Sequence, residues 1–120
     1  MEIISKKTSK SPEITFDNGD ISIVGRSYIE DSVAFYKPLK QLMEAYDGHH
    51  LRLIVYLDFF NTSSSKCLLE LFRIVERACT DGRDASIVWK YQAVNSDMCE
   101  AGEDYHDLLP DVPFEFVSVE

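Results

Sequence analysis

The stretch Tyr56–Phe72, YLDFFNTSSSKCLLELF, decides how the chain folds, because a strand pattern changes to a helix pattern within it. Residues before Asn61 are apolar and β-prone, whereas the residues after it repeat leucine and phenylalanine at helical spacing. Four consecutive hydroxyl residues occupy the junction: Thr62, Ser63, Ser64 and Ser65. One hydroxyl is enough to cap a helix, so the other three call for a second explanation.

The same two patterns alternate through the rest of the chain. Residues 12–27 predict a β-hairpin with Asn18-Gly19 at its turn, and residues 51–60, 85–91 and 113–119 predict three further strands. Helical periodicity covers three segments. The first is residues 30–48, the second follows Asn61 and ends at Gly82, and the third is residues 96–109. The order β-β-α-β-α-β-α-β predicts a single α/β domain over residues 12–120, with a mixed, mostly parallel sheet that carries the hairpin. Residues 1–11 are expected to be loosely ordered.

Two local expectations can be tested against a structure. Pro38 interrupts a helical pattern, and proline suits the first position of a helix, so we expect a short turn at residues 31–36 and a helix that begins at Pro38. The alternative is one helix kinked at Pro38. The strand at residues 51–60 is apolar on both faces, which predicts that both of its faces are covered.

Composition excludes several classes of protein. The net charge of −9 argues against a nucleic-acid or anionic-membrane partner, and we interpret Lys6, Lys7 and Lys10 as a solvated basic cluster. The three cysteines form no CxxC pair or even-numbered framework, which favours reduced thiols. No secretory signal and no membrane-spanning run is visible, so we expect a cytoplasmic protein.

No catalytic set can be assembled from the sequence. The hydroxyl cluster lacks a glycine-rich elbow, no phosphate-binding loop is present, and the histidines have no metal-ligand spacing. We therefore expect no enzymatic activity, no cofactor and no metal. One competing hypothesis is a small enzyme that uses Glu103 or Asp104 as a base, which predicts a pocket lined by carboxylates with raised pKa values.

The hydroxyl cluster allows two interpretations on chemical grounds. In the first, Ser64 or Ser65 caps the helix and the other hydroxyls satisfy backbone groups of the turn. In the second, the cluster lies where ligands and partners of open α/β sheets gather, and one hydroxyl accepts a phosphoryl group. The residues alone leave both interpretations open.

Four segments together carry a family resemblance. GRSYIEDSVAFYKPLKQLMEAY, LDFFNTSSSKCLLELF, IVWKYQ and DMCEAGEDY resemble, in this order and spacing, the SiaC family of bacterial regulatory phosphoproteins, over about Pro12–Phe116. The resemblance implies a STAS-like fold, similar to anti-sigma-factor antagonists. It implies that the acceptor is Thr62, with Ser63 as second choice. The surrounding loop would contact partners: Asn61, Ser63, Ser64, Ser65 and Lys66.

The resemblance also implies partners. A SiaB-like serine/threonine kinase would phosphorylate the chain, and a SiaA-like phosphatase of the PP2C type would reverse the modification. The unphosphorylated form would bind and activate a SiaD-like diguanylate cyclase and so raise cyclic di-GMP. Two alternatives remain: a partner-switching protein with a different output, and a structural interaction domain whose hydroxyls are all satisfied internally. Burial of the Thr62 hydroxyl would favour the structural domain, because a kinase cannot reach it.

Overall fold

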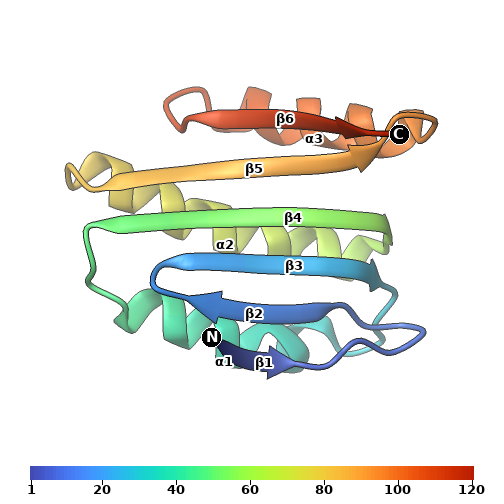
Figure 1. Cartoon of the computed structure of the whole chain (residues 1–120), viewed down its shortest axis with the longest axis horizontal. Helices are drawn as coiled ribbons and strands as arrows, with labels where there is room; N and C mark the ends of the chain where they lie inside the picture. The colour runs from blue at the N-terminus through green and yellow to red at the C-terminus, as the bar shows by residue number, and fades with distance from the viewer.

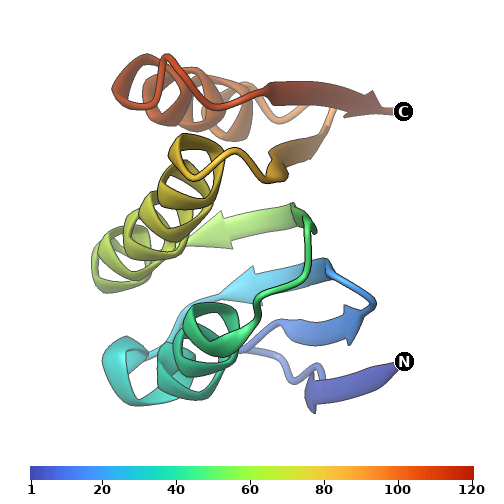
Figure 2. The ribbon, with the colours of Figure 1, turned by 90° about the vertical axis from the view of Figure 1, so that its left-hand side faces the viewer.

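Three helices cover one face of a six-stranded sheet, and the other face of the sheet carries no helix (Figure 2). The computed structural model describes residues 1–120. The strands are β1 (Glu2–Ser5), β2 (Glu13–Asp17), β3 (Asp20–Ser27), β4 (His50–Phe60), β5 (Asp84–Gln92) and β6 (Phe114–Val119). The helices are α1 (Ser32–Ala45), α2 (Thr62–Thr80) and α3 (Ser96–Leu108). None of these helices is both long enough and apolar enough to span a membrane.

The strands lie in the sheet in the order of the sequence, from β1 to β6 (Figure 1). β1, β2 and β3 pair antiparallel, and β3 to β6 pair parallel through crossovers that contain α1, α2 and α3. The predicted mixed, mostly parallel α/β sheet with an N-terminal hairpin is confirmed. We call the edge at which β3, β4, β5 and β6 end the C-terminal edge of the sheet.

The hairpin turn follows its sequence signal, but the segment before it differs from expectation. Asn18 and Gly19 both have positive φ, at 50° and 91°, as a two-residue hairpin turn of this kind requires. Residues 2–5, expected within a loosely ordered segment, form β1 and pair with β2, so the element order gains one strand. A four-residue strand is too short to show a periodic pattern, and pairing with β2 decides its conformation.

The expected helix start at Pro38 is wrong. α1 begins at Ser32, and the side chain of Asp31 caps it by accepting a hydrogen bond from the Ala34 amide at 3.2 Å. Tyr36, Leu39 and Met43 are buried along one stripe of this continuous helix. Pro38 is exposed on the opposite side, where water can satisfy the carbonyl that its missing N–H leaves free.

The expectation that both faces of β4 are covered is also wrong. Leu51, Leu53, Val55 and Leu57 are fully buried beneath the helices, whereas the alternate residues face the open side of the sheet and are half-buried. Side chains of neighbouring strands shield these outer residues. Ile54 lies beside Val88, and the Lys90 amine lies 5.3 Å from the centre of the Tyr56 ring. Lateral packing along the sheet therefore accounts for the apolar outer face of β4.

Aromatic rings fill the core between α2, α3 and the sheet. Phe72 contacts Tyr105 with ring centres 4.8 Å apart, and Trp89 contacts Tyr105 at 5.5 Å. The buried Trp89 indole donates a hydrogen bond to the Met98 carbonyl at 2.8 Å. Gly102 packs directly on Trp89, because a Cβ at this position would lie 2.5 Å from the indole ring. The helices are thereby held against β5 at a fixed distance.

Candidate functional site

The junction between β4 and α2 lies at the C-terminal edge of the sheet, and a single residue, Asn61, connects the two elements. Asn61 has an extended backbone, and its side-chain oxygen accepts a hydrogen bond from the Ser64 amide at 3.0 Å. Its side-chain amide donates to the Ile29 carbonyl at 2.9 Å. The N-cap of α2 is therefore Asn61, and the interpretation that Ser64 or Ser65 caps the helix is wrong.

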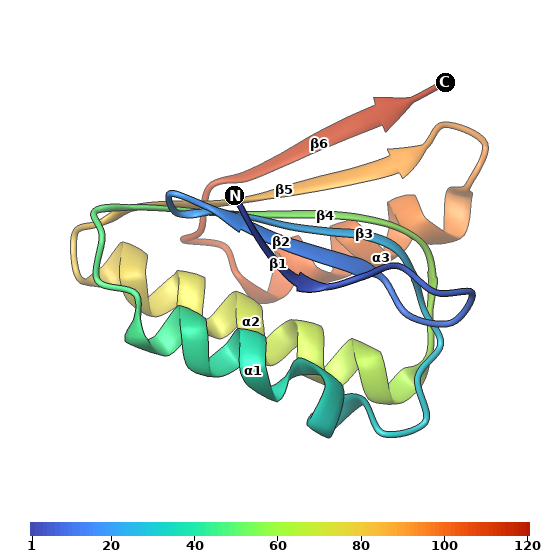
Figure 3. The same cartoon turned by 60° about the horizontal axis from the view of Figure 1, so that its bottom comes forward.

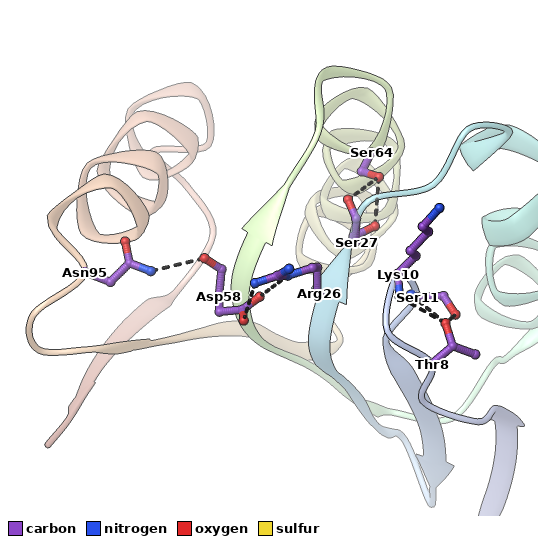
Figure 4. A network of polar contacts seen from close by, with 8 residues as sticks. All are labelled: Thr8, Lys10, Ser11, Arg26, Ser27, Asp58, Ser64 and Asn95. Atoms are coloured by element: carbon purple, nitrogen blue, oxygen red, sulfur yellow. Dashed lines mark hydrogen bonds and ion pairs between the residues drawn. The ribbon is translucent and has the colours of Figure 1, made fainter.

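Ser64 belongs to a buried chain of hydrogen bonds. Ser27 Oγ donates to Ser64 Oγ at 2.8 Å, and Ser64 Oγ donates to the Ser27 carbonyl at 3.1 Å (Figure 4). Tyr36 Oη lies 2.6 Å from Ser27 Oγ and supplies the remaining hydrogen to it. Burial raises the pKa of Tyr36 to about 12, so its phenol stays protonated and available as a donor. Ser64 thus joins α2 to β3.

The hydroxyls of Ser63 and Ser65 are also engaged within the fold. Ser63 Oγ lies 2.8 Å from Ser32 Oγ and contacts the Ile29 carbonyl at 3.3 Å. Ser65 Oγ lies 3.0 Å from Tyr105 Oη, which donates to the Ser65 carbonyl at 2.9 Å. Burial raises the pKa of Tyr105 and keeps this donor protonated as well. These two serines connect the start of α2 to α1 and α3.

Thr62 differs from the three serines. It is the first residue of α2, its side chain is exposed, and its hydroxyl makes no hydrogen bond within the chain. It borders a surface hollow of about 560 Å³, which we call the acceptor hollow. The hollow is lined by Lys10, Tyr28, Glu30, Asn61, Thr62 and Ser63. Lys66 follows one helical turn after Thr62, is exposed, and forms no ion pair.

A β-bulge shapes the surface next to the acceptor hollow. The pairing of β3 and β4 shifts after Gly25 and Leu57, so that Arg26 lies opposite Phe59. The shift leaves Phe59 43% exposed beside Tyr28, with ring centres 5.7 Å apart. The extra residue, Asp58, pairs with Arg26 at 3.3 Å and accepts a hydrogen bond at its carbonyl from Asn95 (Figure 4).

Several residues of this region carried no functional signal in the sequence analysis. They are Ser27, Ser32, Tyr36, Tyr105 and Lys10. Ser27 has a recognisable cue, since it occupies an inward-facing position at the end of an apolar strand, where a hydroxyl needs a partner. Tyr36 and Tyr105 carry the same cue on the buried stripes of their helices. Lys10 has no such cue, because only the fold brings it to Thr62.

The carboxylates of the competing enzyme hypothesis lie outside the main surface hollows. Neither Glu103 nor Asp104 lines any of the five principal surface hollows. No group of three or more His, Cys, Asp or Glu side chains is placed to hold a metal ion. Burial raises the pKa of Cys67 and Cys79, which keeps both as unreactive thiols, and all three cysteines are free.

Comparison with known proteins gives consistent results over nearly the whole chain. The sequence profile of the SiaC family regulatory phosphoproteins matches residues 5–119. An uncharacterized protein of Pseudomonas aeruginosa strain UCBPP-PA14 is 31% identical in an alignment 105 residues long, and the match covers 83% of each chain.

Two solved structures from the same species are also similar. A chain in the crystal structure of diguanylate cyclase SiaD in complex with its activator SiaC from Pseudomonas aeruginosa matches with a TM-score of 0.87 and 29% identity, covering 94% of this chain and 96% of that one. The crystal structure of apo-SiaC from Pseudomonas aeruginosa matches with a TM-score of 0.83 and 25% identity, covering 98% of this chain and 99% of that one.

Proposed function

Because the chain belongs to the SiaC family of regulatory phosphoproteins, we propose that it is a non-enzymatic signalling switch controlled by phosphorylation of Thr62. In its unphosphorylated form it binds and activates a diguanylate cyclase, and phosphorylation ends this activation. The similarity to a chain of the complex between SiaD and its activator SiaC supports a cyclase as the partner. The free cysteines are in keeping with a location in the reducing cytoplasm.

The observation that carries the proposal is the exposed and unpartnered hydroxyl of Thr62. The three serines that follow it hold α2 to β3, α1 and α3, and each would lose hydrogen bonds on modification. A SiaB-like kinase transfers the γ-phosphoryl group of ATP to Thr62 Oγ1, with release of ADP and the hydroxyl proton. A SiaA-like phosphatase of the PP2C type hydrolyses the ester and restores the hydroxyl with release of inorganic phosphate. Ser63, the second choice, is disfavoured by its bond to Ser32.

The partner surface we propose surrounds the acceptor. Four large apolar side chains at the C-terminal edge are exposed: Tyr28 (54%), Val33 (71%), Phe59 (43%) and Val94 (92%). They lie at the ends of β3, β4 and β5 or at the start of α1, which places them at the same edge as Thr62. Exposed apolar side chains that gather in one region are typical of an interaction surface. The loop from Asn61 to Lys66 completes this surface.

The switch needs no change of fold. A phosphate on Thr62 adds a charge of about −1.5 to −2 and strong hydration at the edge of the partner surface. Removal of that charge from water on binding costs free energy. The chain already carries a net charge of −9, so the phosphate also adds like-charge repulsion. The start of α2 tolerates the charge because a helix N-terminus favours anions, whereas the interface does not. Phosphorylation therefore weakens partner binding while the chain stays folded.

Mass spectrometry of the protein from its native host tests the acceptor. We expect one phosphate on the peptide that contains residues 61–66, assigned to Thr62, which disappears after treatment with phosphatase. A Thr62→Ala chain should lose this phosphate, and a matched Ser65→Ala chain should keep it, because Ser65 is engaged with Tyr105. Phosphate on Ser63 in place of Thr62, or no phosphate under any growth condition, would contradict the proposal.

A further inference from the structure

The segment between β1 and β2, residues 6–12, reaches the C-terminal edge of the sheet and lies beside the loop that leads from β3 to α1 (Figure 3). We call this segment the strap. Hydrogen bonds among Thr8, Lys10 and Ser11 define its fold. The Thr8 hydroxyl accepts from the Lys10 and Ser11 amides at 3.2 and 2.9 Å and also pairs with the Ser11 hydroxyl. The Thr8 amide donates to the Ser11 carbonyl at 3.0 Å. The Tyr28 amide donates to the Lys10 carbonyl at 2.8 Å. The backbone of Lys10 is thereby fixed at both sides.

The side chain of Lys10 lines the acceptor hollow together with Thr62. It extends away from Thr8 and Ser11, toward the same end of the sheet as Ser64 (Figure 4). Lys10 takes part in no ion pair, although the chain carries 21 acidic residues. It is the one cationic residue that lines this hollow, and Glu30 is the one anionic residue.

We propose that Lys10 binds the phosphate of phosphorylated Thr62 within the same chain. The inference rests on the proposed phosphorylation and adds the residue that recognises it. An ammonium group forms charge-assisted hydrogen bonds with phosphate oxygens, and Lys10 lines the same hollow as the modified residue. The basic cluster that the sequence analysis interpreted as solvated therefore contributes one residue, Lys10, to the regulatory site.

When Lys10 binds the phosphate, the contact connects the strap to the start of α2 across the acceptor hollow. This contact also lies next to Tyr28, because Lys10 and Tyr28 both line the acceptor hollow. The same two residues line an adjacent hollow of about 640 Å³, which Phe59 also lines. The modified form then presents a Lys10 side chain held over part of the surface that the unmodified form offers to its partner. Phosphorylation accordingly acts on the partner surface by added charge and by the position of this side chain.

Titration of the phosphate by ³¹P nuclear magnetic resonance tests this proposal. The full chain is produced with phosphothreonine incorporated at position 62, so that no kinase is needed. The second pKa of a phosphothreonine is about 6, and a nearby cation lowers it because the cation favours the dianion. In the Lys10→Gln chain we expect the titration midpoint to rise by roughly half a pH unit. In the Glu30→Gln chain, which removes a like charge, we expect it to fall.

Two matched lysines serve as controls. Lys6→Gln makes the same charge change in the same strap but lies outside the acceptor hollow, and Lys66→Gln removes the exposed lysine on the next turn of α2. We expect no measurable shift for Lys6→Gln and a smaller one for Lys66→Gln than for Lys10→Gln. An unchanged midpoint in the Lys10→Gln chain, or a larger shift for Lys66→Gln, would overturn the proposal. Because the phosphate is incorporated directly, either result is independent of whether cells phosphorylate Thr62.

Discussion

At the scale of the residue, four adjacent hydroxyls divide into two groups. Ser63, Ser64 and Ser65 connect α2 to its neighbours, and Thr62 alone is free. The sequence identifies the stretch but leaves the division open, because the residues of β3, α1 and α3 that the serines contact lie 31 to 40 residues away in the chain. The question raised by the four hydroxyls therefore has a structural answer for three of them. The proposed phosphorylation accounts for the fourth.

A pair of alanine substitutions separates the two groups. Ser64→Ala removes a hydroxyl that is fully buried and leaves Ser27 Oγ without its acceptor, so we expect the free energy of unfolding to fall by about 1–3 kcal/mol. Thr62→Ala changes an exposed side chain and should alter the free energy of unfolding by less than about 0.5 kcal/mol. Urea unfolding followed by circular dichroism measures both values. Equal losses in the two variants would contradict the division of roles.

At the scale of the element, periodic sequence patterns predict most helices and strands. They do not identify which neighbouring elements cover each face of a helix or strand. The hairpin turn and the glycine that ends α2 follow their signals: Gly82 has φ 82°, and the Arg83 amide donates to the Ala78 carbonyl at 3.0 Å. α1 continues through Pro38 because burial of Tyr36 and Leu39 on one stripe outweighs the loss of one hydrogen bond on the exposed side. The outer face of β4 is apolar because neighbouring strands shield it.

Gly102 sets the distance between α3 and β5, and its substitution tests that contact. In a free helix, alanine is favoured over glycine by about 1 kcal/mol. At this position a Cβ would lie 2.5 Å from Trp89 and 2.9 Å from Phe116, so overpacking outweighs the gain in propensity. We expect Gly102→Ala to lower the free energy of unfolding by about 1 kcal/mol. Glu100→Ala, at an exposed position of the same helix, should leave it nearly unchanged, and a stabilised Gly102→Ala chain would contradict the contact.

At the scale of the whole molecule, the mixed, mostly parallel sheet with its N-terminal hairpin and the family assignment agree with the expectation from the sequence, whereas the open second face of the sheet does not. The relation to STAS proteins stays a prediction. The acceptor hollow could not be predicted, because its residues come from the strap, the end of β3, the loop before α1 and the start of α2. The segment that leads into β2 brings Lys10 to that place, where its carbonyl accepts a hydrogen bond from the Tyr28 amide at 2.8 Å.

Three strands are joined at the opposite edge of the sheet by His50, which predicts a pH dependence of stability. Its two ring nitrogens lie 2.7 Å from Asp20 of β3 and 3.2 Å from Asp84 of β5. The hydrogen bond to Asp20, followed by that to Asp84, raises the pKa of His50 above its ordinary value of 6.5. A raised pKa in the folded state means that the stabilisation is complete below pH 6.5 and is lost as the pH rises through the folded-state pKa.

Comparison with His50→Gln measures this contribution. We expect the difference in thermal midpoint between the original chain and the variant to be larger near pH 5.5 than near pH 8.5. The effect should be modest, because the His50 side chain is 44% exposed and solvent screens the pair. A difference that grows toward high pH would contradict the assignment of a protonated His50 between the two carboxylates.

The central claim is that the phosphorylation state of Thr62 controls activation of a diguanylate cyclase. The most direct measurement is the rate of cyclic di-GMP synthesis by the SiaD-like cyclase of the same organism, with the unmodified chain or the chain carrying phosphothreonine at position 62 added in turn. We expect activation by the unmodified chain and by Thr62→Ala, and at least about tenfold weaker apparent affinity for the phosphorylated chain, which corresponds to about 1.4 kcal/mol. Equal activation by the phosphorylated and unmodified chains would contradict the account.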